Sequence, residues 1–277
     1  MSRTRFWLVV GLLALFATAF VAAGCGDDDD DDGETAAAGD LGLLQEGTLT
    51  VGSDIPFPPF ELGDPPDYEG FDIDVINAVA EKMELQTRII DAPFDVILQG
   101  GKGRFDLAIA ATTTTGPREN RVDFSDPYFE AQQGLLVQSG GDVQSIDDLT
   151  SDSVVGAQDG TTGETYAEEN TDAEVRPFPE IDDAYNALAG GQADAVLNDL
   201  PSVQAAVDDN PDLEVVEEFE TNELYGIVFP DGTGALREAV NEALAEMKED
   251  GTLDEIYQEW FELDAPPNVV EGTHEPT

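Results

Sequence analysis

The sequence has 277 residues, of which 61 are aspartate or glutamate and 11 are lysine or arginine, so the formal net charge is −50. Such a polyanion repels the phosphate backbone, which excludes nucleic acid as a partner. Acidity spread along a whole chain suits a saline environment, where ions screen the repulsion between like charges. His274 is the single histidine and Cys25 the single cysteine, which excludes histidine-assisted serine, thiol and histidine-ligated zinc chemistry.

The first 25 residues have the pattern of an export signal. Arg3 and Arg5 precede an apolar stretch over residues 6–21, and small residues then lead to Cys25. This ending resembles a bacterial lipobox, in which the cysteine is lipidated and becomes the mature amino terminus. An uncleaved membrane anchor is the alternative, since the apolar length is close to the minimum for a span. Both interpretations place the rest of the chain outside the cytoplasm, attached to a membrane.

Residues 26–46 are expected to form an acidic, disordered tether. They include the consecutive aspartates 27–32 and a Gly/Ala-rich segment, which together cannot bury apolar surface, and like charges extend such a chain. Cleavage before Cys25 removes two arginines and no acid, which changes the formal charge from −50 to −52.

From residue 47 onward, short apolar strands alternate with helical segments, a pattern typical of α/β folds with largely parallel sheets. Strands are predicted at 49–53, 87–90, 107–110 and 135–137, with a helix over 73–83 and another near 96–98. Gly140-Gly141 follow the last of these strands and are expected to be a crossing point between two modest domains.

A second α/β set follows the two glycines. Strands are predicted at 154–157, 175–178, 193–199 and 225–229, with helices after Thr161 and over 181–188. Residues 236–247 continue as a helix, and Ile256, Trp260 and Phe261 close the chain with an apolar anchor.

Arg118 is the most informative candidate for a binding residue. It follows the buried strand at 107–110 and the four threonines 112–115, which leave hydroxyl and backbone N–H groups at the carboxyl end of the strand. A guanidinium can hold a carboxylate with two parallel hydrogen bonds, and the threonines can satisfy its remaining lone pairs. The alternative is a solvated surface arginine, but a lone arginine in so acidic a chain does not belong to a general basic surface.

Asp199 gives a second and complementary signal. It ends the apolar strand over residues 193–199, so its carboxylate is delivered where the strand meets solvent. A carboxylate there can accept hydrogen bonds from an ammonium group. Together Arg118 and Asp199 predict a site for a zwitterionic amino acid.

Seven motifs between residues 47 and 261 carry a resemblance to a known family. They are residues 53–60, 70–74, 113–118, 123–126, 160–161, the strand ending at Asp199, and 250–252. The chain resembles the extracytoplasmic solute-binding proteins of ABC importers, polar amino-acid family (family 3), and within it the glutamine-binding proteins.

The resemblance implies an α/β, two-lobed periplasmic-binding-protein fold of type II. Each lobe is then a mostly parallel sheet flanked by helices, with the ligand in the cleft between the lobes. Residues 47–137 and 226–264 would form a discontinuous first lobe, residues 138–225 the second lobe, and residues 265–277 a flexible tail.

The resemblance also implies a set of binding residues. Arg118, Thr113 and the Ala111 backbone would take the α-carboxylate, and Asp199 with the Ala111 carbonyl would take the α-ammonium. Gly160, Thr161 and Thr162 lie before a helix, where free N–H groups and the helix dipole favour the same carboxylate. Phe57 and Phe94 would stack on the aliphatic part of the ligand, although single phenylalanines more often belong to a core.

Asp54 ends the first strand and would face the ligand side chain, where it can accept equally from an amide, an ammonium or a guanidinium. Gln158 stands where the glutamine-binding pattern has a lysine, and Asn198 where it has a histidine. Glutamine, lysine, arginine and histidine therefore all remain candidates for the ligand.

The function implied is capture of a polar L-amino acid by cleft closure and its delivery to ABC permease subunits. We expect a monomer, lipid-anchored to the outer face of the cell membrane, with no cofactor and no metal. A ligand-sensing module for a signalling partner is one alternative. A carboxylate-based dehydratase on the same fold is the other, although the charged residues of the cleft already have binding roles.

Overall fold

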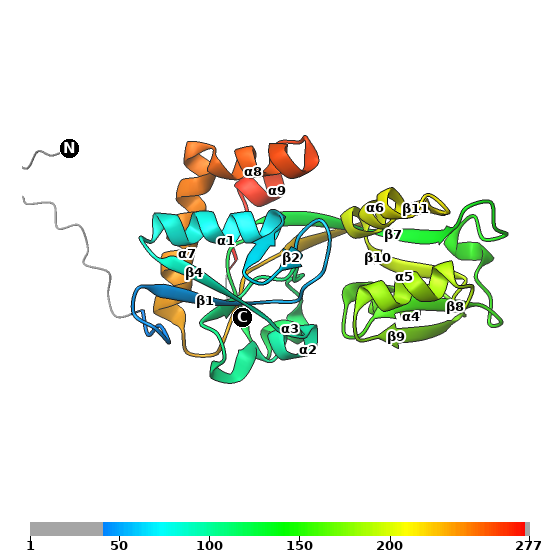
Figure 1. The fold of residues 1–277 in the computed structure, drawn as a ribbon, viewed down its shortest axis with the longest axis horizontal. Helices are drawn as coiled ribbons and strands as arrows, with labels where there is room; N and C mark the ends of the chain where they lie inside the picture. The colour runs from blue at the N-terminus through cyan, green and yellow to red at the C-terminus, as the bar shows by residue number, and fades with distance from the viewer. Residues whose placement is uncertain (1–40, 275–277) are drawn as a thin grey trace, which may run out of the picture. The chain divides into compact units, whose positions relative to one another are not determined.

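The computed structural model of the protein describes residues 41–274. The predicted signal, Cys25 and most of the predicted tether lie outside these residues. Strands and helices alternate through the described part, as the sequence predicts, and the strands form two five-stranded sheets (Figure 1). No helix between residues 41 and 274 is long and apolar enough to cross a membrane.

The first sheet has the strand order β4-β1-β5-β12-β6. β4 and β5 lie parallel to β1, whereas β12 runs antiparallel to β5 and β6. All residues of β1 are buried, as expected for a central strand covered on both faces. The bounds are Thr48–Ser53 for β1, Gln86–Asp91 for β4, Leu107–Ala108 for β5, Asp123–Phe124 for β6 and Val228–Phe229 for β12.

The second sheet follows the same plan, with the order β9-β8-β10-β7-β11. β9 and β10 lie parallel to β8, and β7 runs antiparallel to β10 and β11. In each sheet, therefore, the fourth strand in the order, β12 or β7, runs antiparallel to both of its neighbours. The bounds are Phe129–Gln138 for β7, Val154–Gln158 for β8, Glu174–Phe178 for β9, Ala195–Asp199 for β10 and Leu213–Tyr225 for β11.

Helices connect and cover the strands of both sheets. α1 (Phe71–Lys82) packs on β4, α7 (Gly234–Asp250) and α8 (Thr252–Phe261), and α4 (Thr162–Asn170), α5 (Ile181–Ala189) and α6 (Leu200–Asp209) pack on β10. Short elements complete the fold: α2 (Phe94–Ile97), α3 (Gly116–Glu119), α9 (Pro267–Val270), the 3₁₀ helices Gly100–Gly103 and Ile146–Asp148, and the hairpin of β2 (Leu62–Asp64) and β3 (Asp67–Glu69).

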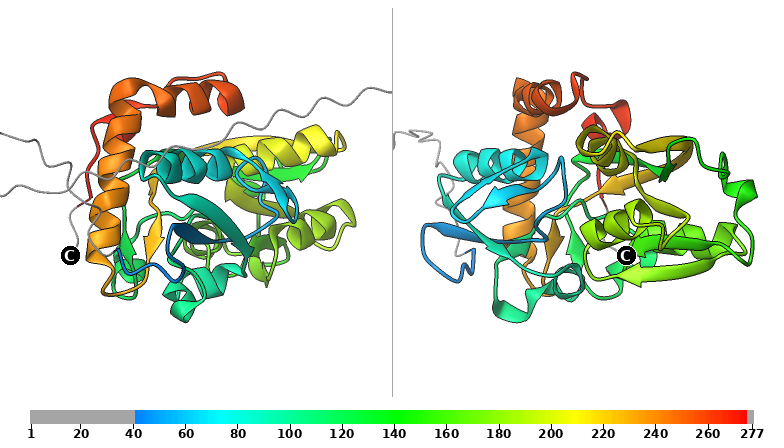
Figure 2. Two further views of the ribbon diagram at one scale, coloured as in Figure 1. Left: turned by 60° about the vertical axis from the view of Figure 1, so that its left-hand side comes forward. Right: turned by 45° about the vertical axis from the view of Figure 1, so that its right-hand side comes forward.

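Gly251 separates α7 from α8, which turn sharply against each other (Figure 2). Its φ of 86° lies in the left-handed region that glycine adopts without steric cost, and such a residue commonly ends a helix. Asp250 then accepts hydrogen bonds from the backbone N–H and the hydroxyl of Thr252, which starts the next helix. The motif at 250–252 is thus a helix-to-helix corner.

The crossing between the two sheets differs from the expected place. Gly140 and Gly141 lie in a turn in which Gly141 N–H donates to Gln138. Residues 133–137 of β7 pair with β10, so they already belong to the second sheet. The lobe boundary after residue 137 stays a prediction. Phe129, the first residue of β7, already pairs with β11 of the second sheet, so the chain passes from the first sheet to the second between β6 and β7.

Two further expectations need correction. Residues 225–229 do not form one strand, because β11 ends at Tyr225 in the second sheet and β12 begins at Val228 in the first. Residues 265–274, expected as part of a flexible tail, contain α9, in which Val269 is fully buried. The backbone N–H of His274 donates to Asp126, so the segment packs on the fold as far as that residue.

An aromatic cluster joins α1, the start of β7, the end of β11 and α8. Phe71, the first residue of α1, is fully buried at its centre. Its ring lies 5.0 Å from that of Tyr257 and 5.2 Å from those of Phe129 and Phe261, in edge or tilted orientations. Edge-on aromatic pairs stabilise beyond the area that they bury. The cluster therefore fixes α8 against β7 and β11.

We expect Phe71→Ala to lower the free energy of unfolding by about 3–5 kcal/mol, because it empties a fully enclosed ring position. Chemical denaturation measures this loss. Leu263→Ala is the control, since Leu263 is 63% exposed and its truncation should change stability by less than about 0.5 kcal/mol. Equal stability of the two variants would contradict the role given to the cluster.

Candidate functional site

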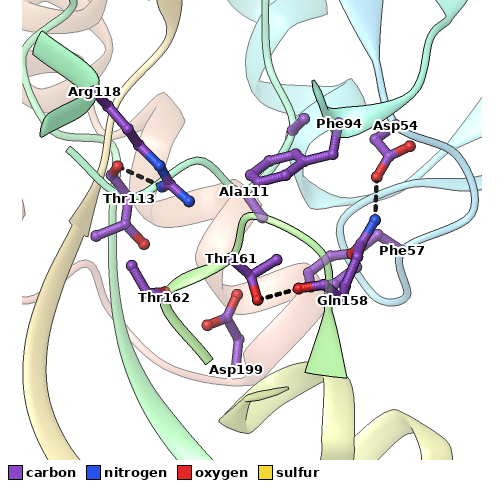
Figure 3. A pocket seen from close by; sticks show the side chains of 11 residues that line it. Asp54, Phe57, Phe94, Ala111, Thr113, Arg118, Gln158, Thr161, Thr162 and Asp199 are labelled. Atoms are coloured by element: carbon purple, nitrogen blue, oxygen red, sulfur yellow. Dashed lines mark hydrogen bonds between the residues drawn. The ribbon is translucent and has the colours of Figure 1, made fainter. Parts of the chain in front are cut away.

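One pocket gathers residues from the carboxyl ends of strands in both sheets (Figure 3). Ten of the twelve predicted ligand-binding residues line it, and Ala110 joins them. Gly160 and Asn198 do not line it. The lining residues are Asp54, Phe57, Phe94, Ala110, Ala111, Thr113, Arg118, Gln158, Thr161, Thr162 and Asp199.

The pocket is narrow. Its volume, counted for the centre of a water molecule, is about 20 Å³, close to the room that a single water needs. Thr113, Arg118, Thr161 and Thr162 also line a broad groove that adjoins it, so the pocket opens to solvent along these residues. An amino acid can enter only if the residues around the pocket move apart.

Arg118 lies on α3, and its guanidinium points into the pocket (Figure 3). Nη1 donates to the carbonyl of Thr113 at 2.7 Å and Nη2 to the carbonyl of Gly160 at 3.1 Å. The guanidinium carbon lies 5.3 Å from the centre of the Phe94 ring, a favourable cation–π distance. Burial lowers the pKa of Arg118, while Asp199 and Glu223 oppose this, and a guanidinium stays cationic throughout.

Asp199 enters the pocket from the end of β10 and is 7% exposed. Burial, and to a smaller extent the charge of Glu223, raise its pKa to about 7. Tyr225, Gln133 and Arg118 act in the opposite direction. Among residues 41–274 no ion pair joins Asp199 to Arg118, so the two groups face the same pocket without direct neutralisation.

Asp54 and Gln158 form the other end of the pocket, across the Phe94 ring from Arg118 (Figure 3). The Gln158 amide donates to Asp54 at 2.7 Å and to the carbonyl of Pro179 at 3.2 Å. Burial raises the pKa of Asp54 to about 7, although the hydrogen bond from Gln158 lowers it. This contact joins residues that follow β1 of the first sheet and end β8 of the second.

The segment before α4 differs from the expectation of three free N–H groups. Gly160 N–H donates to Glu164 at 2.7 Å and Thr161 N–H to Gln158 at 3.4 Å, while the Thr161 hydroxyl caps the helix by accepting from Glu164 N–H. Thr162 is the first helical residue, and its N–H has no partner within the helix. Gly160 contributes its carbonyl to Arg118 and is thus an acceptor in this structure.

Asn198 points away from the pocket, since its amide donates to the Tyr185 hydroxyl at 3.0 Å. Alternate residues of a strand face opposite sides of the sheet, so a strand that aims Asp199 at the pocket aims Asn198 at α5. The expected contact between Asn198 and a ligand therefore has no support in this structure.

Two buried acids lie behind Ala111. Asp72 accepts from Ala111 N–H at 2.7 Å and from the Tyr128 hydroxyl at 2.8 Å, and neighbouring Glu61 is fully buried. Burial and the charge of Asp72 raise the pKa of Glu61 well above its usual range, so Glu61 is protonated and Asp72 carries the charge. Ala111 has a φ of 42°, a strained value for a residue with a side chain, and Asp72 holds it there.

Sequence reasoning did not identify three residues beside the pocket: Gln133, Glu223 and Tyr225. They lie on the strands β7 and β11. Gln133 and Tyr225 interact with Asp199, and Glu223 accepts a hydrogen bond from the Thr113 hydroxyl. The sequence offers only the position of Gln133 shortly before the apolar residues 135–137, and its full burial appears only in the structure. No group of three or more His, Cys, Asp or Glu side chains within residues 41–274 is arranged to hold a metal ion.

Comparison with known proteins places this geometry in a family. The chain is 35% identical over 203 residues to the "ABC transporter glutamine-binding protein GlnH" of Bacillus subtilis (strain 168), covering 71% of this chain and 74% of that protein. An ancestral arginine-binding protein, solved with glutamine and with arginine, superposes with a TM-score of 0.73 in both structures. The identity is 38% for the glutamine complex and 39% for the arginine complex, and each alignment covers 78% of this chain and 99% or 98% of that one.

A third similar structure is the ancestral amino-acid-binding protein AncCDT-1, "a precursor of cyclohexadienyl dehydratase". It has 36% identity and a TM-score of 0.71, and the alignment covers 78% of this chain and 96% of that one. These similarities and the two equivalent sheets confirm the predicted two-lobed type II fold. Residues 49–263 match the model of the "Bacterial extracellular solute-binding proteins, family 3". The chain therefore belongs to this family of extracellular solute-binding proteins.

Proposed function

We propose that this protein binds a free polar L-amino acid, glutamine or a basic one, outside the cytoplasm and delivers it to an ABC permease. One observation carries the proposal: Arg118 and Asp199 line the same pocket but do not pair with each other. Asp199 is buried and Arg118 is half-buried, and such charges without a counter-charge are unfavourable unless a ligand supplies the opposite charge. An α-amino acid supplies both.

The remaining lining residues fit the rest of such a ligand. Arg118 and the N–H of Thr162 are donors for the α-carboxylate, and Asp199 is the acceptor for the α-ammonium. Phe57 and Phe94, each 7% exposed, flank the aliphatic part, and Asp54 takes the polar end of the side chain. The two complexes of the ancestral arginine-binding protein, with glutamine and with arginine, support a site of this kind for either side chain.

Closure of the lobes follows from contacts that cross between them. The hydrogen bonds from Gln158 to Asp54 and from Arg118 to Gly160 each join the two lobes. Opening breaks both, and a ligand that bridges Arg118, Asp199 and Asp54 favours the closed state through contacts that it lacks when the lobes are apart. The closed form, rather than a chemical product, is then what the permease recognises, and binding leaves the ligand unchanged.

A thermal-shift screen of the twenty amino acids tests the proposal. A ligand at one hundred times its Kd adds about 2.7 kcal/mol of stability, which raises Tm by roughly 5–10 °C for a protein of this size. The ligand should be recovered chemically intact. No shift with any amino acid would refute the proposed function.

Arg118→Ala and Asp199→Ala should each weaken binding of the identified amino acid by roughly 30-fold or more, since removing one partner of a buried charged contact costs about 2–5 kcal/mol. Isothermal titration calorimetry measures the change. Arg121→Ala is the matched control, because Arg121 lines the outer groove and not the pocket. Unchanged affinity in either pocket variant would remove that residue from the site.

The preference for arginine over glutamine should rise as the pH rises through about 7. The pKa of Asp54 is raised to about 7, so this carboxyl is largely neutral below that pH and charged above it, and only the charged form attracts a guanidinium. Both ligands carry the same α-ammonium, so the ratio of their Kd values cancels the titration of Asp199. Asp54→Asn should abolish the pH dependence of this ratio; a ratio that still changes with pH in this variant would assign the effect elsewhere.

We further propose that Cys25 is lipidated and that the protein is held as a monomer on the outer face of the cell membrane. The small residues before this single cysteine support the first part. Cys25→Ser should move the protein from the membrane fraction to the culture medium or periplasm. Retention of the variant in the membrane fraction would favour an uncleaved anchor instead.

A further inference from the structure

Gln133 lies between two carboxylates. In the register of the second sheet it stands directly opposite Asp199 of β10, so their side chains share one face of the sheet. Its Nε2 donates to Oδ1 of Asp199 and, at 3.0 Å, to Oε1 of Glu223 on β11. Three neighbouring strands thus bring Asp199, Gln133 and Glu223 into one row.

The chemistry of the row fixes how the Gln133 amide is oriented. An amide nitrogen carries two hydrogens, one for each carboxylate, whereas a flipped amide would present its carbonyl oxygen to two acceptors. Its Oε1 is buried without a hydrogen-bond partner among the described residues, which shows that donation to the carboxylates outweighs satisfaction of the carbonyl. Gln133 therefore occupies one oxygen of Asp199.

Glu223 ties the row to the carboxylate end of the pocket. Its Oε2 accepts from the Thr113 hydroxyl at 2.7 Å. A hydroxyl has one hydrogen, so Thr113 cannot donate to a ligand carboxylate while it donates to Glu223. Glu223 lies at a break in the pairing of β11 with β7, next to Asn222, whose φ is 52°. The strand is irregular at the point where it presents this carboxylate to the pocket.

We propose that Gln133 and Glu223 are a pair of positioning residues that act on Asp199 in opposite directions and so set the pH range in which the site holds the ligand ammonium. Gln133 stabilises the charged form of Asp199 by donating to it, and Glu223 destabilises that form by its like charge. The inference rests on the proposed function, because it gives Asp199 the ammonium.

The charged and titratable groups that face Asp199 come from three elements. Arg118 lies on α3, Glu223 and Tyr225 on β11, and Tyr185 on α5. With a pKa of about 7, Asp199 loses its charge as the pH falls through that value, and affinity for an ammonium falls with it. The midpoint of the pH profile is the pH at which half of Asp199 is charged. Removing the charge of Glu223 lowers this midpoint, and removing the amide donor of Gln133 raises it.

The test is the Kd of wild type, Glu223→Gln and Gln133→Met as a function of pH. It is measured by calorimetry with L-glutamine or, if wild type does not bind it, with whichever other amino acid gives the largest thermal shift. We expect the midpoint of the pH profile to move down by roughly half a unit or more in Glu223→Gln and up by a similar amount in Gln133→Met. Glu223→Gln keeps an acceptor for Thr113, so its fold should be intact.

Matched controls lie on the same two strands. Gln132→Met makes the same change one residue earlier, on the opposite face of β7, and Glu220→Gln removes the same charge from an exposed position of β11. Both should keep the wild-type midpoint. A purely structural role would weaken binding equally at every pH and leave the midpoint in place.

The outcomes separate this inference from the function on which it rests. If wild type binds none of the twenty amino acids, the proposed function fails. If wild type binds but the midpoints of Glu223→Gln and Gln133→Met stay fixed or move in the same direction, the function stands and the positioning pair is wrong. Should Gln133→Met fail to fold, a lower midpoint in Glu223→Gln supports the pair and an unchanged one overturns it.

Discussion

A half-buried arginine and a buried aspartate face one pocket without pairing, and the rest of the structure depends on this constraint. Water cannot solvate Arg118 and Asp199 fully, and the protein compensates each only in part: backbone carbonyls for the guanidinium, an amide for the carboxylate. Direct pairing would neutralise both and leave nothing for a ligand. The fold keeps them apart because α3, between β5 and β6 of the first sheet, carries one, and β10 of the second sheet carries the other.

The two sheets make this separation possible. Both have the same strand order, and in both the polar residues of the site follow the carboxyl ends of parallel strands, where ligands of open α/β sheets bind. β7 and β11 are the long strands of the second sheet, and the aromatic cluster around Phe71 fixes α8 against them. A closing cleft needs a rigid anchor and contacts that form when it shuts. The aromatic cluster supplies the anchor, and the hydrogen bonds across the pocket supply the contacts.

Acidic residues have two separate physical roles in this chain. All 61 count toward the formal charge of −50, and salt screens the repulsion between those on the surface. Those around the pocket are buried, and burial raises the pKa of Asp54, Asp199 and Glu61, so protonation becomes a means of control near neutral pH. The protonated form of Glu61 allows Glu61 and Asp72 to be buried next to each other. Asp72 in turn holds the strained backbone of Ala111 beside the pocket.

The sequence alone determined the alternation of strands and helices and the residues that follow strand ends, among them Arg118 and Asp199, because periodicity and turn residues are local signals. The family followed from the resemblance that the motifs between residues 47 and 261 carry. Only the tertiary structure decided what depends on register and on distant segments. In the folded protein Asn198 faces away from the pocket, and the carbonyl of Gly160 accepts a hydrogen bond from Arg118. Gln133 lies between two carboxylates that are 66 and 90 residues away in the chain. Such contacts arise when strands pair, and no window of sequence contains both partners.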